Sequence, residues 1–274
     1  MKRLAVLISL LPMAFGCEVV WNNGPTQLLR DIFKITEIEN VENLEYATKQ
    51  SNFRWIRPKG LERWHLYSIL LDHQRVKLEK IIKNSALAKE KMPTKKHYYA
   101  VVILGATTTR VSTRMEFLLK LAKNGVTWEN VFLLGSDRDL NTGPEADQRM
   151  AEFLRLRESQ ETEMAMMEYL WSQFNKPKFC QDMKAISVQA GKRPDGARAT
   201  TEDILIELVK IMGDVKEQSV LFISNNPYIC YQDAVVKRIL KHHNINMETV
   251  GEAMSGESME NVLDTVARCL TNIS

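Results

Sequence analysis

The chain has 274 residues, of which 45% are hydrophobic and 26% charged, and its 37 basic and 34 acidic side chains leave a net charge of only +3. This length and composition indicate one large globular domain, or one domain with an appendage. The basic residues are dispersed along the chain, so the charge pattern implies no strongly polyanionic or membrane-surface partner, and we expect no nucleic-acid ligand.

The first 17 residues have the layout of a secretory signal peptide. Two basic residues precede an apolar run (residues 4–15) that is too short to span a bilayer, and the small residues Gly16 and Cys17 follow. The pattern predicts export to the periplasm or the medium. It also resembles a bacterial lipoprotein cleavage box, so simple cleavage and membrane anchoring through a lipid on Cys17 both stay open. The alternative is a buried first element of a cytosolic protein.

The remaining cysteines are widely spaced and form no CxxC pair: Cys180, Cys230 and Cys269. This pattern disfavours a zinc site or a disulfide framework, so we expect no metal site. A single disulfide bridge stays open, and the sequence does not choose its pair.

Residues 18–96 are predicted to form an N-terminal helical layer. Apolar residues between Leu66 and Ile81 recur at spacings near three and four, and the segment has no glycine after Gly60.

Residues 97–274 are predicted to form an α/β domain with a doubly wound, mostly parallel, Rossmann-like sheet, because short apolar runs alternate with amphipathic helices. The predicted strands are residues 98–104, 130–134, 184–189, 219–224 and 247–250, and the predicted helices are residues 115–122, 163–174, 201–212, 233–240 and 258–270. Such sheets bind ligands outside the carboxyl ends of their strands, beside helix N-termini. This rule selects four polar loops as candidate sites.

The loop after the first predicted strand combines a glycine, threonines and arginines. The glycine lets the backbone turn sharply, threonine hydroxyls and helix N–H groups suit a phosphate or carboxylate, and an arginine can clamp the anion. The loop matches neither GxGxxG nor GK[ST], so a plain helix cap with solvated arginines is the alternative. Its candidate ligand-binding residues are Gly105, Thr107, Thr108, Arg110 and Arg114.

The other three loops follow the later strands. Ser136 lies in the second, where a solvated turn is the alternative reading. Thr200 lies in the third, before acidic residues that the helix macrodipole alone would favour. Asn225, Asn226 and Tyr228 form the fourth, and consecutive amides at a strand end are better ligand donors and acceptors than core residues. GxSxG is absent and no histidine arrangement suggests a triad, which disfavours a serine hydrolase.

Taken in order, these segments resemble the DUF218 family of envelope proteins, the ElyC, SanA and YdcF type. The resemblance implies a Rossmann-like fold, an exported or envelope location, and a polar small-molecule site. It departs after the late strand, where that family tends to have a Tyr-His pair and then an arginine, whereas this chain has Tyr228 and then Gln232. The matching segments are residues 99–105, Arg114, and residues 132–136, 162–164, 200–203 and 220–224.

Two functions stay open at this point. In the first, the chain is an exported protein that binds a small anionic or nucleotide-like ligand. If it is an enzyme, it also processes this ligand. Acid–base roles would then fall to Glu163, Glu202 and Asp203, while the asparagines would hold a polar ring or sugar. In the second, a non-enzymatic envelope or host-interaction protein uses the α/β body as a scaffold and the helical layer to bind a partner. The sequence predicts neither a cofactor nor an oligomeric state.

Overall fold

The computed structural model of the protein describes residues 21, 24–39, 41–58, 69–140, 162–191, 193, 199–213 and 215–273. The predicted signal peptide and Cys17 therefore lie outside the described residues. Within these ranges, none of the helices combines the length and the hydropathy that a membrane-spanning segment needs.

A single parallel sheet forms the centre of the described chain. Its five strands are β1 (His97–Leu104), β2 (Thr127–Gly135), β3 (Ile186–Gln189), β4 (Ser219–Asn225) and β5 (Asn246–Glu252), in the order β3-β2-β1-β4-β5. Every neighbouring pair of strands is parallel. The predicted Rossmann-like, doubly wound class is confirmed. Residues 100–104 of β1 are buried because this strand lies in the middle of the sheet with helices on both faces.

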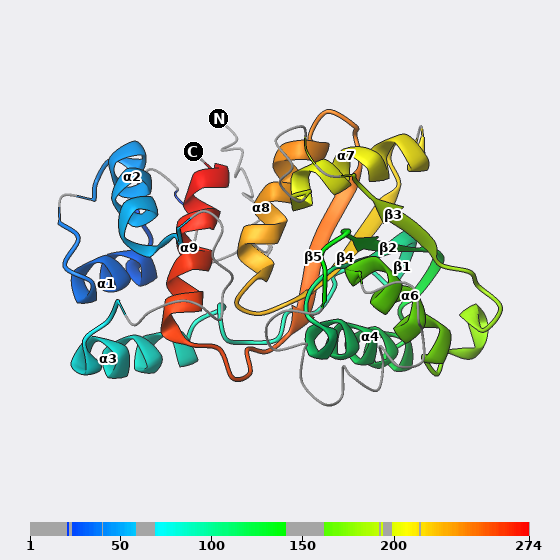
Figure 1. Ribbon diagram of the computed structural model, residues 1–274, viewed down its shortest axis with the longest axis horizontal. Helices are drawn as coiled ribbons and strands as arrows, with labels where there is room; N and C mark the ends of the chain where they lie inside the picture. Colours follow the sequence, from blue (N-terminus) through cyan, green and yellow to red (C-terminus); the bar gives the residue numbers. More distant parts are fainter. Residues whose placement is uncertain are drawn as a thin grey trace, which may run out of the picture.

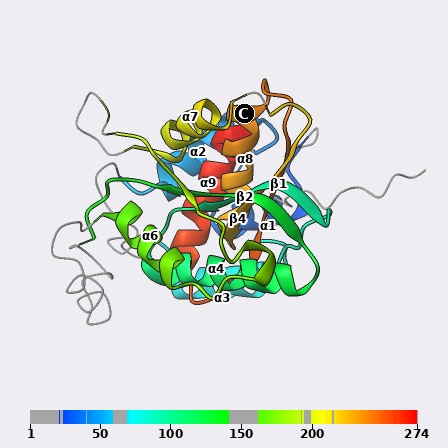
Figure 2. The same cartoon turned by 90° about the vertical axis from the view of Figure 1, so that its right-hand side faces the viewer.

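Helices cover both faces of the sheet, as Figure 2 shows. On one face, α4 (Thr108–Lys123) and α6 (Glu163–Gln173) pack against Val101 and Ile103. On the other, α7 (Thr201–Met212) and α8 (Ile229–Leu240) pack against residues 100, 102 and 104. The alternation follows from the period of two of a strand, which sends successive side chains to opposite faces.

A third apolar core holds the helical layer beside the sheet domain (Figure 1). It joins α1 (Gln27–Ile35), α2 (Leu44–Trp55) and α3 (Asp72–Lys83) to the C-terminal helix α9 (Met259–Ile273), which lies between α8 and α2. The rings of Phe33 and Trp55 stack within it at 5.4 Å. The layer predicted from residues 18–96 is therefore completed by the end of the chain.

The apolar pattern predicted between Leu66 and Ile81 faces inward only in part. Residues 66–68 of this pattern lie outside the described residues. The helix α3 begins at Asp72, and its buried apolar side chains are Leu78 and Ile82, whereas Val76 is 65% exposed. The spacing rule found the helix but assigned part of its face wrongly.

The described cysteines lie in two different cores. Cys180 is a buried thiol in the core under α4 and α6, while the Sγ atoms of Cys230 and Cys269 lie 2.7 Å apart in the core of the helical layer. Burial raises the pKa of the Cys269 thiol above its ordinary value. The described residues contain no group of His, Cys, Asp and Glu side chains that could hold a metal ion.

Candidate functional site

A cavity of about 310 Å³ opens at the carboxyl ends of β1 and β2. The strand order reverses between β1 and β4, which is the topological switch point where sheets of this class bind ligands. The register of the strands brings the carboxyl ends of β1, β2 and β4 together, since Leu104 pairs with Leu134 and Ile103 pairs with Ile223. The loops after these strands therefore leave the sheet side by side, and the first turns of α4, α6, α7 and α8 surround the opening.

Arginine is the commonest charged residue of this cavity. Among the described residues five arginines line it: Arg57, Arg110, Arg114, Arg138 and Arg268. The only acidic side chain among the described lining residues is Glu163. Two further carboxylates, Glu257 and Asp264, pair with these arginines, and they leave arginine in excess within the described structure. The chemistry of the lining therefore favours an anion.

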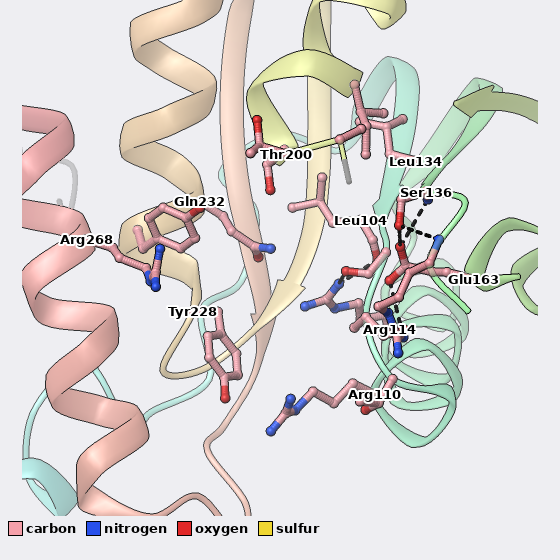
Figure 3. Close-up of a pocket in the computed structure, with 18 of the residues that line it drawn as sticks. Leu104, Arg110, Arg114, Leu134, Ser136, Glu163, Thr200, Tyr228, Gln232 and Arg268 are labelled. Carbon is pink, nitrogen blue, oxygen red and sulfur yellow. Dashed lines mark hydrogen bonds and ion pairs between the residues drawn. The ribbon is translucent and has the colours of Figure 1, made fainter. Parts of the chain in front are cut away.

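Arg114 fixes the geometry where β1 meets β4. Its Nε and Nη2 atoms donate to Oδ1 of Asn225 at 3.1 and 2.9 Å, and its Nη1 donates to the carbonyl oxygens of Leu104 at 2.5 Å and Gly105 at 3.0 Å. The side chain is only 2% exposed, and its guanidinium faces the cavity in Figure 3. Asn225 is thus a support for the arginine, whereas the sequence predicted it as a ligand contact.

Arg110 is held by a carboxylate that the sequence reading missed. Its Nε and Nη2 atoms donate to Oε1 of Glu257 at 3.1 and 2.5 Å, and its guanidinium lies 4.9 Å above the ring of Tyr228. The Tyr228 hydroxyl donates to Oε2 of Glu257 at 2.7 Å. Glu257 follows β5, so extending the strand-end rule to a fifth loop would have found it.

Glu163 begins α6 and lies against the ends of β1 and β2. Its Oε2 accepts hydrogen bonds from the main-chain N–H of Ser136 at 3.0 Å and from the Ser136 hydroxyl at 2.6 Å. Its Oε1 lies 3.6 Å from Nη2 of Arg138. A Cβ atom on Gly105 would lie 2.6 Å from the carbonyl oxygen of Leu134 and 3.0 Å from Cδ of Glu163. Glycine is therefore required at position 105 because Leu134 and Glu163 approach it closely.

The helical layer supplies the last wall of the cavity. Asp264 of α9 is fully buried and accepts hydrogen bonds from Nε and Nη2 of Arg268 at 2.9 and 3.0 Å and from the main-chain N–H of Arg57 at 3.3 Å. Burial lowers the pKa of the Arg268 guanidinium, but the hydrogen bonds and the charge of Asp264 outweigh this effect, so the pKa is raised. In the sequence Asp264 and Arg268 resemble an ordinary exposed helix pair, and nothing signalled their place in the cavity.

Two predicted threonines line the cavity and one does not. Thr107 is the N-cap of α4 and makes no side-chain capping hydrogen bond, so its hydroxyl is available at the cavity wall. Thr200 is the N-cap of α7 and also lines the cavity. Thr108 is the first residue of α4 and is not among the lining residues.

The other predicted residues lie around the cavity rather than in it. Glu202 pairs with Arg238 of α8 at 2.7 Å, and Asp203 closes a capping box with Thr200. Asn226 donates from Nδ2 to the carbonyl oxygen of Ala86 at 2.9 Å and to that of Lys89, so it holds the chain before β1. None of these three lines the cavity, and their described contacts are structural.

Asp203 makes stability depend on pH. Its hydrogen bonds with Arg193, aided by those with Thr200, hold the pKa of the carboxyl at about 2, below its ordinary 3.8. Because the pKa of this carboxyl is lower in the folded protein than in the unfolded chain, the ionised carboxylate stabilises the fold above pH 3.8. This stabilisation is lost as the pH falls toward 2. We expect Asp203→Ala to lower Tm at neutral pH by about 2 to 4 °C, the shift for a lost cap. In thermal unfolding the difference from the unsubstituted protein should shrink between pH 4 and pH 2, and an undiminished difference would contradict the assignment.

The chain matches no protein-family model and none of the curated proteins with which it was compared. The resemblance to the DUF218 family therefore rests on the sequence motifs alone.

Proposed function

We propose that the protein binds a small anionic ligand in the cavity at the carboxyl end of the sheet. The observation that carries this proposal is the excess of arginine among the described lining residues. Guanidinium groups bind carboxylates and phosphates through charge-assisted hydrogen bonds, so the lining favours a negatively charged occupant.

The volume of the cavity and the side chains that line it limit the class of ligand. A volume of about 310 Å³ is at the lower end of the roughly 300 to 1,000 Å³ of small-molecule sites, which favours a compact metabolite over a dinucleotide. Ser224 donates from Oγ to Oε1 of Gln232, which leaves the Gln232 Nε2 atom directed toward the cavity (Figure 3). Together with the Thr107 hydroxyl, this amide supports a ligand that has hydroxyl or carbonyl oxygens beside its anion.

Glu163 is the candidate acid–base group if the ligand is processed, because it is the acidic side chain among the described lining residues. Glu202 and Asp203 are not proposed again for this role, since their carboxylates are engaged in the ion pair with Arg238 and in the α7 cap. The helical layer contributes Arg57 and Arg268 to the cavity, which favours ligand binding over a separate partner-binding role for that layer.

We also propose, from the sequence motifs, that the chain is a divergent DUF218-like protein exported to the envelope, free or anchored through a lipid on Cys17. Mass spectrometry of the mature protein tests this part. A new N-terminus near Cys17, with or without an added lipid mass, is the expected result, and an intact Met1 would contradict export by this route.

Isothermal titration calorimetry with inorganic phosphate, glucose 6-phosphate and AMP, against glucose and adenosine as neutral counterparts, tests the binding proposal. We expect Arg138→Gln to weaken the binding of a phosphorylated probe by about tenfold or more, because a charge-assisted hydrogen bond contributes roughly 1.5 to 3 kcal/mol. Arg238→Gln is the matched control, since Arg238 pairs with Glu202 outside the cavity and should leave affinity unchanged. Phosphorylated probes that bind no better than their neutral counterparts would contradict the proposal.

A further inference from the structure

The arginines of the cavity come from two separate walls. Arg110, Arg114 and Arg138 follow β1 and β2 in the sheet domain, whereas Arg57 and Arg268 belong to the helical layer. Figure 3 shows Arg268 on the opposite side of the cavity from Arg114. Positive charge therefore lines both ends of one small space.

The wall of the helical layer is built around one buried carboxylate. Asp264, which is fully buried, holds the main chain at Arg57 and two nitrogens of Arg268. This bidentate pairing uses one edge of the Arg268 guanidinium and sets its orientation. The remaining Nη1 has no hydrogen-bond partner among the described protein groups, and Figure 3 shows the guanidinium turned toward the cavity. The free edge is suited to a second anion.

The space between the two walls is lined by polar side chains and by the aromatic side chains of Tyr228 and Tyr231. Gln232 and Thr200 lie between Arg268 on one side and Arg114 on the other in Figure 3. The Gln232 amide suits the hydroxyl groups of a ligand body and would serve an alkyl chain poorly, whereas the Thr200 hydroxyl is already engaged by Asp203 in the cap of α7.

We propose that the ligand carries an anionic group at each end of a hydroxylated body, as a small sugar bisphosphate does, and this inference rests on the proposed function. One phosphate contacts Arg138 and the wall of the sheet domain. The other contacts the free edge of Arg268, and the body lies against Gln232 and Thr200. One anion on the wall of the sheet domain would leave the free edge of Arg268 without an anion to bind, which is why the two-wall arrangement favours two.

Calorimetric titration of the full chain with fructose 1,6-bisphosphate and fructose 6-phosphate tests this inference, with fructose as the neutral control. In the unsubstituted protein we expect the bisphosphate to bind at least about tenfold more tightly than the monophosphate. Arg268→Gln should reduce this preference to less than about threefold, while the monophosphate keeps its affinity through the other wall. Arg138→Gln should weaken both sugar phosphates by about tenfold and leave their ratio in place, and Arg238→Gln should leave both affinities unchanged.

Arg268→Gln removes the two charged hydrogen bonds of the buried Asp264 and is expected to lower stability. The double variant Asp264→Asn, Arg268→Gln removes that charge and keeps the test valid if the single variant does not fold. Equal affinities of the two sugar phosphates in the unsubstituted protein would overturn the two-anion inference and leave the proposed function standing. A preference that survives both Arg268 variants would also overturn it, and a chain that binds neither phosphate would contradict the proposed function itself.

Discussion

Replacement of Arg114 by methionine is expected to lower the free energy of unfolding by about 3 to 5 kcal/mol, because it leaves three acceptors unsatisfied at roughly 1 to 3 kcal/mol each. The side chain is 2% exposed, and the substitution leaves the carbonyl oxygens of Leu104 and Gly105 and the amide oxygen of Asn225 without their donor. These three groups lie at the ends of β1 and β4, so the crevice between the strands should lose its shape. We expect anion binding to fall below detection by calorimetry.

Two further variants separate the charge of Arg114 from its geometry. Arg114→Lys keeps the charge but offers donors from a single nitrogen, so it should recover little of the lost stability. Arg238→Met removes an arginine whose side chain is 39% exposed and pairs with Glu202, and it should cost no more than about 1 kcal/mol. Urea denaturation of the three variants gives the comparison. An Arg114→Met variant as stable as Arg238→Met would show that the hydrogen bonds at the strand ends contribute little.

The sheet was predictable because its strands are buried on both faces and so appear as unbroken apolar runs. The segment from Tyr98 to Leu104 has this pattern, and it is β1 at the centre of the sheet. The predicted α7 begins at Thr201 as observed, because Thr200 and Asp203 form a capping box that can be recognised from local spacing. Once the strands were known, the convergence of Gly105, Ser136 and Thr200 on one edge followed from parallel pairing.

The contacts that orient the side chains around the cavity were not predictable from the sequence. Which residues of a loop face inward depends on contacts between segments distant in sequence. The hydrogen bonds of Asn226 to residues before β1 and the pair of Glu202 with α8 are examples. The same limit hid Glu257 and Asp264, since each places an arginine of the cavity only after α9 has packed onto the sheet domain.

Gly105→Ala is the second substitution with a large expected effect, because the added methyl group would meet backbone rather than a mobile side chain. The new Cβ would lie 2.6 Å from the carbonyl oxygen of Leu134, and Leu134 is fixed by its pairing with Leu104. Relief requires β1 and β2 to separate at the cavity, and Glu163 to move away from Ser136 as well. We expect a loss of about 3 kcal/mol in the free energy of unfolding, at the upper end for overpacking.

The same close contact at Gly105 also makes the substitution affect ligand binding. Displacement of Glu163 or of the β2 end shifts Arg138 and Ser136 together, so affinity for a phosphorylated probe should fall by about tenfold or more. Gly191→Ala is the matched control, because a Cβ there meets no atom within 4 Å and the change should stay within about 0.5 kcal/mol. If Gly105→Ala folds and binds the probe as tightly as Gly191→Ala does, the wall formed by Glu163 and Ser136 takes no part in holding the anion.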